Sequence, residues 1–310
     1  GLQAVEAETI EPRSETYYLL QAACLASSGR ALGRPETAAA ATDRVQRWLE
    51  MVTRTGFPAG HSQTFDALRL ACLNWVWWGA GESAAVDAAI QIASADIAGR
   101  IWTPGPMLAG AAWRAYPGDY LTGGGVSTYV LPMFGEGNYE NAEPFSMFIT
   151  LPRFETLGQP ASEDIRQFDT RSSGDVTATT TYLSPQFTLG TLSGVLTSSS
   201  IPLLMQFASG TPTAYAWASP SPARVATVQN GPSALLTFDF DRIGNGTRRQ
   251  AFARIVLGKR EDIRAVYAHG DQWDNQPTGI AQRESVAIQM NECYVGVVLG
   301  RRGPVSGDIE

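Results

Sequence analysis

Side chains able to move protons or to neutralise an anion gather in two short stretches of the 310-residue chain. His61 stands at the expected start of a helix. The second stretch is irregular and holds Arg114, Tyr116 and Tyr120. A histidine can accept a proton near neutral pH, a tyrosine can donate or accept one, and an arginine can neutralise a carboxylate. We take these four residues as the candidate catalytic set.

The irregular stretch also carries polar and aromatic side chains suited to binding a hydroxylated ligand. These candidate binding residues are Trp113, Asp119, Asn138 and Tyr139. The Trp and Tyr rings could stack on a sugar ring, and Asp119 could orient Arg114 or His61. A structural interpretation stands beside each of these roles. His61 could simply close a turn, Arg114 could form a buried ion pair with Asp119, and the tyrosines could pack in a core.

Residues 12–102 are rich in alanine, with apolar side chains at helical intervals. The pattern predicts four helices, over 15–28, 35–54, 64–78 and 83–101. Pro35 suits a first helical turn, and Ser62 and Ser83 suit N-caps. Gly29 and Gly33 follow the first of these segments and are expected to end it.

Residues 144–300 are instead rich in Thr, Val, Ser, Phe and Tyr, with Gly and Pro at short intervals. This composition predicts many short strands. We expect them at 145–151, 176–183, 187–197, 202–208, 213–218, 223–229, 234–240, 251–257, 263–269, 285–291 and 294–299. The chain therefore divides into a helical part with an aromatic loop, 1–143, and an antiparallel β-sandwich, 144–310, in an α+β fold.

Charge and composition exclude several classes of partner. The net charge of −7 disfavours binding to a nucleic-acid backbone. No apolar run approaches the ~20 residues that a membrane-spanning helix needs. The three cysteines are far apart, and no metal-ligand cluster or dinucleotide fingerprint is present, so we expect neither metal nor cofactor. The chain begins at Gly1, so a cytoplasmic protein and one secreted after loss of a signal peptide are both compatible with it.

Three segments resemble the heparinase II/III-like polysaccharide lyases, which combine an (α/α) toroid with a β-sandwich. They are residues 60–65 (GHSQTF), 108–116 (LAGAAWRAY) and 181–191 (TYLSPQFTLGT). The chain differs from the family pattern in having His61 where an asparagine is expected and in lacking a histidine near Ala112. The resemblance implies a partial (α/α) toroid of helices followed by the sandwich, with 181–191 forming a strand pair.

The resemblance also implies β-elimination on a uronic-acid sugar, in a cleft between the two parts. One group must neutralise the carboxylate, a base must take the neighbouring proton, and an acid must protonate the departing oxygen. Two alternatives remain. One is a cyclase or isomerase of specialised metabolism with an apolar cavity, and the other is a non-catalytic carbohydrate-binding module. An open groove lined by arginine would favour an acidic sugar, whereas a closed aromatic cavity would favour an apolar substrate.

The ligand is thus expected to be a small molecule or an oligosaccharide. Four helices are too few to close a toroid, so the helical part is either a trimmed toroid or one that a second copy completes. Because an incomplete helical layer leaves apolar faces exposed, a homodimer is the simplest expectation.

Overall fold

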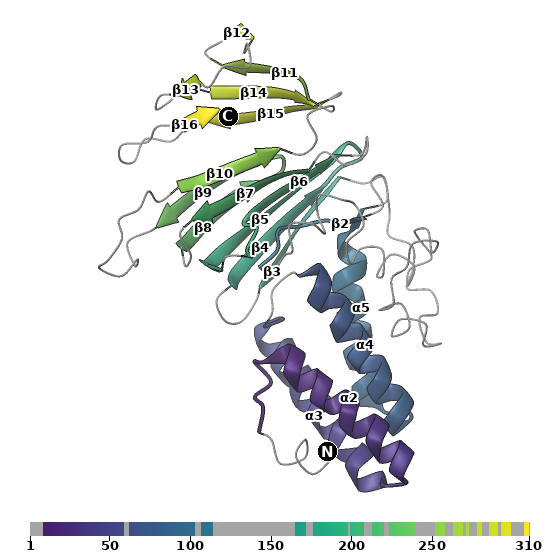
Figure 1. Ribbon diagram of the computed structural model, residues 1–310. Coiled ribbons are helices and arrows are strands. Elements are labelled where there is room, and N and C mark those ends of the chain that lie inside the picture. The colour runs from purple at the N-terminus through teal and green to yellow at the C-terminus, as the bar shows by residue number, and fades with distance from the viewer. Residues whose placement is uncertain are drawn as a thin grey trace, which may run out of the picture.

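A computed structural model describes the helical region, the segment that follows it and most of the strands. The described residues are 9–58, 62–102, 107–113, 165–171, 176–197, 199–207, 213–219, 223–239, 252–257, 263–268, 271–272, 278–280, 285–290, 293–298 and 307–309. Helices come first and antiparallel sheets follow, so the predicted α+β class is confirmed (Figure 1). The strand expected at 145–151 and the boundary at 143–144 lie outside the described residues.

The four predicted helices are present. They are α2 (Glu15–Leu32), α3 (Pro35–Thr55), α4 (Gln63–Ala80) and α5 (Ala84–Arg100). Pro35 occupies the first turn of α3, where its missing N–H has no intrahelical partner to lose. Ser62 and Ser83 are the N-cap residues of α4 and α5, but neither side chain makes a capping hydrogen bond. Both predicted N-cap positions are therefore confirmed, although the side-chain hydrogen bond typical of such caps is not formed.

Helix α2 continues past Gly29, where it was predicted to stop, and ends at Gly33. A methyl group at position 29 would lie 2.7 Å from the backbone nitrogen of Ala38 in α3. Gly29 thus serves the close approach of two helices rather than a helix end. Gly33 adopts the left-handed conformation (φ 64°) that favours glycine and ends the helix.

Helices α2 and α4 are neighbours and run parallel to each other. Glu15, at the start of α2, is ion-paired with Arg69 near the start of α4. In the second halves of the two helices, a methyl group at Gly79 would lie 2.5 Å from the carbonyl carbon of Ala26. Since α3 joins α2 to α4, the helices form two αα-hairpins packed side by side (Figure 1).

One apolar core lies between these helices. Its large buried members include Leu19, Leu25, Val45, Trp48, Leu70, Leu73, Val76 and Ile97. Ile101 and Leu108, from the short antiparallel strands β1 (Ile101–Trp102) and β2 (Met107–Leu108), belong to the same core. The core therefore extends to the chain that leads into the sheets.

The larger sheet has eight antiparallel strands. They are β3 (Arg166–Arg171), β4 (Val176–Leu183), β5 (Phe187–Leu196), β6 (Leu203–Phe207), β7 (Thr213–Ser219), β8 (Ala223–Asn230), β9 (Ser233–Asp239) and β10 (Phe252–Leu257). Their order is β10-β7-β6-β5-β4-β3, with the β8–β9 hairpin joined to β5. Strands β4 and β5 pair directly, so the strand pair expected at 181–191 is present.

A four-stranded sheet and a two-stranded sheet follow. They contain β11 (Ile263–Ala268), β12 (Asp271–Gln272), β14 (Ser285–Met290) and β15 (Cys293–Val298), and β13 (Thr278–Ile280) and β16 (Gly307–Ile309), respectively. Phe207 of β6 belongs to one apolar cluster with Val286, Ile288 and Val295 of the four-stranded sheet. The two larger sheets therefore share a core.

The segment 107–113 connects the helical core to the larger sheet. Ala112 and Ile201 exchange two backbone hydrogen bonds, of 3.1 and 2.7 Å. A methyl group at Gly190 of β5 would lie 2.3 Å from the backbone nitrogen of Ala111. The segment therefore packs with its backbone directly on the face of β5.

Candidate functional site

Most of the predicted site lies outside the described residues. This applies to the catalytic candidates His61, Arg114, Tyr116 and Tyr120 and to the binding candidates Asp119, Asn138 and Tyr139. For these seven residues the predicted roles stay predictions. The structure does describe one neighbour of each of two of them, because Ser62 follows His61 and Trp113 precedes Arg114.

Trp113 is the one binding candidate that the structure describes. Its indole Nε1 donates a hydrogen bond to the carbonyl of Val195 at 3.3 Å, and its own carbonyl accepts one from Ser200 Oγ at 2.7 Å. The ring is half-buried beside an apolar cluster that includes Leu192 and Leu196 of β5. Trp113 is thus anchored to the sheet by both its side chain and its backbone carbonyl, immediately before Arg114 in the sequence.

The start of α4 and the end of α5 are held together by an ion pair. Arg100 Nη2 lies 2.7 Å from Asp66 Oδ2, and both side chains are fully buried. The backbone carbonyl of Arg100 accepts a hydrogen bond of 2.8 Å from the N–H of Ala109. The residues following His61 and the segment leading toward Arg114 are therefore tied to the same end of the helical layer.

Further buried charges extend this link into a network that spans all four helices. Arg69 lies 2.9 Å from Glu15 and 3.0 Å from Asp66, and Arg100 also pairs with Asp96 at 2.8 Å. From α3, Trp48 Nε1 donates a 3.1 Å hydrogen bond to Glu15. We call Glu15, Asp66, Arg69, Asp96 and Arg100 the ion network.

The ion network holds three carboxylates against two guanidinium groups. Burial on its own lowers the pKa of Arg69, but Glu15 and Asp66 outweigh it and raise that pKa above its ordinary value. Asp66 and Asp96 raise the pKa of Arg100 in the same way against the effect of burial. Both arginines therefore stay charged, and the network positions the helix ends rather than exchanging protons.

Phe57 connects the ion network to the chain before His61. The guanidinium carbon of Arg69 lies 4.2 Å from the centre of the buried Phe57 ring, a cation–π contact. Phe57 lies two residues after the end of α3 and four before His61. Its buried ring therefore fixes the position of the chain just after α3.

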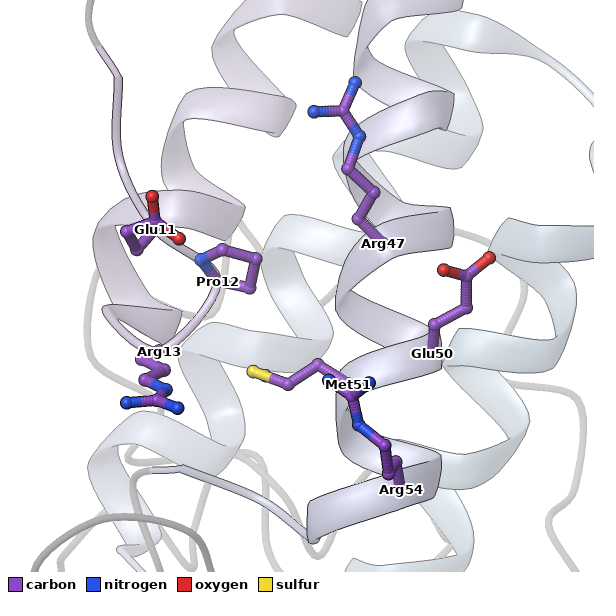
Figure 2. A pocket seen from close by; sticks show the side chains of 7 residues that line it. All are labelled: Glu11, Pro12, Arg13, Arg47, Glu50, Met51 and Arg54. Carbon is purple, nitrogen blue, oxygen red and sulfur yellow. The ribbon is translucent and has the colours of Figure 1, made fainter.

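An open hollow of about 480 Å³ lies at this end of the helices (Figure 2). Its walls come from the chain just before α2 and from the last two turns of α3, and it is lined by Glu11, Pro12, Arg13, Arg47, Glu50, Met51 and Arg54. We call it the arginine hollow. Glu15 follows Arg13 by two residues and is hydrogen-bonded to Trp48, which follows Arg47, so the Glu15 end of the ion network is connected to both walls.

Sequence reasoning did not anticipate either feature. A signal for the ion network existed, because Asp66 and Arg69 stand three residues apart within an otherwise apolar helix, and Asp96 and Arg100 stand four apart. Charged residues in helices packed on several faces must find partners. The arginine hollow had no comparable signal, since its two walls are more than 30 residues apart in the chain.

Comparison with known proteins identifies no relative. No family model matches the chain, and no curated protein or solved structure is significantly similar to it. Among the described helices, none is long and apolar enough to cross a membrane. Within the described ranges, no three His, Cys, Asp or Glu side chains are grouped so as to hold a metal ion.

Proposed function

We propose that this protein is a lyase-like enzyme that cleaves a uronic-acid polysaccharide or oligosaccharide by β-elimination. The reaction would take place between the helical part and the sheets. The observation that carries the proposal is the Asp66–Arg100 ion pair, since it ties the chain that follows His61 and the chain that leads toward Arg114 to one end of the helical layer.

Two further contacts support the proposal. Segment 108–113, which belongs to one stretch resembling the lyases, packs against Gly190 in another such stretch. Trp102 Nε1 also donates a 2.7 Å hydrogen bond to the carbonyl of Ser184, in the turn between β4 and β5. Residues that carry the resemblance are therefore neighbours in space and not only similar in sequence.

The finer description of the fold belongs to the same proposal. Stacked αα-hairpins whose alternate helices run parallel are what part of an (α/α) toroid would contain. Two antiparallel sheets with a shared apolar cluster are compatible with a β-sandwich. A second copy would then complete the helical layer, and sedimentation showing a monomer at micromolar concentration would count against that dimer.

In the proposed reaction, Arg114 neutralises the substrate carboxylate and so acidifies the proton on the adjacent carbon. His61 removes that proton, a carbon–carbon double bond forms, and the bond to the glycosidic oxygen breaks. Tyr116 or Tyr120 protonates the departing oxygen. The products are a chain with a new free hydroxyl and a chain ending in an unsaturated uronate.

The arginine hollow favours an acidic ligand over the apolar substrate of a cyclase. It is open and carries three guanidinium groups, whereas a cyclase of the kind considered above needs an enclosed aromatic cavity. A binding module without catalysis remains the alternative, and product formation separates it from the lyase.

The test is to incubate the purified protein with a panel of uronic-acid polysaccharides and to follow the ultraviolet absorbance of the unsaturated product. We expect product from at least one acidic polymer and none from a neutral one. His61→Ala should reduce the rate at least about 100-fold, and so should whichever of Tyr116→Phe and Tyr120→Phe removes the hydroxyl that protonates the departing oxygen. His269→Ala, which alters the other histidine, should leave the rate unchanged. Absence of product across the panel would reject the proposal.

A further inference from the structure

Three positive side chains of the arginine hollow have no acidic partner among the residues that the structure describes. Arg13, Arg47 and Arg54 are exposed, and none of them forms an ion pair with a carboxylate in the described part of the chain. By contrast, Arg69 and Arg100 behind the hollow are fully paired. The hollow thus gathers three solvent-exposed guanidinium groups around one space.

Helix geometry places several of these groups on one face. Arg47, Glu50, Met51 and Arg54 are spaced at i, i+3, i+4 and i+7 along α3, which puts them in one stripe. Arg13 lies on the opposite wall, in the chain before α2 (Figure 2). Two arginines from a helix and one from the opposite wall therefore border the same volume.

The remaining lining residues supply complementary chemistry. Glu50 accepts a 2.7 Å hydrogen bond from Gln46 Nε2, which fixes its carboxylate on the surface of α3. Glu11 stands on the other wall, so five charged side chains give a net charge of +1. Met51 is buried, and Figure 2 shows its side chain reaching from α3 toward Pro12. Met51 and Pro12 provide an apolar surface between the charged groups.

We propose that the arginine hollow is a binding site for a hydroxylated ligand that carries an oxyanion. The guanidinium groups of Arg13, Arg47 and Arg54 would bind the oxyanion, because a guanidinium offers paired N–H donors that match a carboxylate or a phosphate. Glu11 and Glu50 accept hydrogen bonds from hydroxyl groups, and Met51 packs against the carbon skeleton. A volume of about 480 Å³ is within the usual size of small-ligand sites.

None of the residues that line this site belongs to the candidate catalytic set, so ligand binding here can be measured separately from the proposed lyase activity. A carboxylated sugar and a phosphorylated sugar share the required chemistry. The measurement therefore uses digalacturonate and glucose 6-phosphate as separate acidic probes, and the uncharged disaccharide lactose as the neutral control.

Isothermal titration calorimetry on the full chain tests the proposal. We expect at least one acidic probe to bind, with an affinity that falls as salt is added, and lactose not to bind. Loss of one exposed guanidinium should weaken binding by up to about fivefold, so Arg13→Gln should have an effect of that size and Arg47→Gln/Arg54→Gln one of about tenfold. Arg34→Gln is the matched control, because Arg34 is also exposed and precedes α3 at its other end.

Binding of either acidic probe with these losses supports the site, and the probe that binds identifies its oxyanion. Failure of both probes to bind the unaltered protein would overturn it, as would equal affinity in the Arg13→Gln and Arg47→Gln/Arg54→Gln variants. Binding that persists in His61→Ala, in which we expect the lyase rate to be strongly reduced, would show that the hollow binds its ligand separately from the reaction centre. If the protein is an active lyase but the arginine substitutions do not reduce its affinity for either acidic probe, the binding site in the arginine hollow is rejected and the lyase proposal stands.

Discussion

Arg100 Nη2 lies 2.7 Å from Asp66 Oδ2, and this contact joins the last turn of α5 to the first turn of α4. Asp66 also pairs with Arg69, so one buried carboxylate serves two guanidinium groups. Removing its charge would leave both arginines short of a partner inside the protein, where an uncompensated charge is costly.

Asp66→Asn should therefore lower the free energy of unfolding by about 3–5 kcal/mol. Urea denaturation would measure it, with Asp43→Asn as the control because Asp43 is exposed on α3. Asp96→Asn should cost less than Asp66→Asn, since the Asp96 side chain is less deeply buried than that of Asp66. A loss below about 1 kcal/mol for Asp66→Asn would contradict the central place of this carboxylate.

Two helical glycines should respond in opposite directions to alanine. Gly79→Ala forces a methyl group to within 2.5 Å of the Ala26 backbone, so α2 and α4 must separate and stability should fall by about 1–3 kcal/mol. Gly99→Ala in α5 meets no atom within 4 Å and should raise stability by about 0.5–1 kcal/mol, because alanine favours the helix. Thermal denaturation of both variants checks the contrast, and equal effects would show that the approach of α2 to α4 is looser than described.

A second glycine pair tests the contact between segment 107–113 and β5. Gly190→Ala would place a methyl group 2.3 Å from the Ala111 nitrogen, which is backbone and cannot swing away as a side chain could. We expect a loss of about 1–3 kcal/mol and faster hydrogen exchange at the amide of Ala112. Gly296→Ala in β15, which has open space, should change stability by no more than about 0.5 kcal/mol. Unaltered exchange at Ala112 in Gly190→Ala would argue against the contact.

The three cysteines are free thiols, and they should differ in reactivity. Burial raises the pKa of the Cys72 thiol to about 12, with smaller contributions from Cys24 and Glu15. At about pH 8, iodoacetamide should label the exposed Cys24 well before Cys72, as peptide mass spectrometry would show. Labelling of Cys24 and Cys72 at the same rate in the folded protein would contradict the buried position of Cys72.

The same shift predicts a dependence of stability on pH. An unfolded cysteine ionises near pH 8.5, whereas folded Cys72 keeps its proton to about pH 12, so the folded state binds more protons in between. The contribution of the protonated Cys72 thiol to stability is therefore complete below about pH 8 and is lost as the pH rises. Cys72→Ala should therefore show a shallower decline in urea stability between about pH 8 and pH 10 than the unaltered protein.

Local patterns were enough to predict most of the described elements. The strand predicted at 234–240 is present as β9, in which Leu235 is exposed and Leu236 and Phe238 are half-buried. The end of α2 was misplaced because a glycine can end a helix or let another helix approach, and only the position of Ala38 decides which. Strand β3, at the sheet edge, was not predicted, since its sequence RQFDTR is largely polar.

The site was harder to predict than the fold for the same reason. Asp66 and Arg100 are 34 residues apart, and Arg13 and Arg54 are 41 apart, so no local pattern links them. Their juxtaposition follows from helix packing, in which the start of α2, the end of α3, the start of α4 and the end of α5 meet at one end.

The short span between Ala109 and Ala112 limits how the helices and the larger sheet can move apart. The amide of Ala109 is bound to Arg100 on the helical side, and Ala112 is bound to Ile201 on the sheet side. Three residue steps of extended chain cover only about 10 Å. Any opening between the helices and the larger sheet must therefore pivot on this short segment, or break the hydrogen bonds at one end of it.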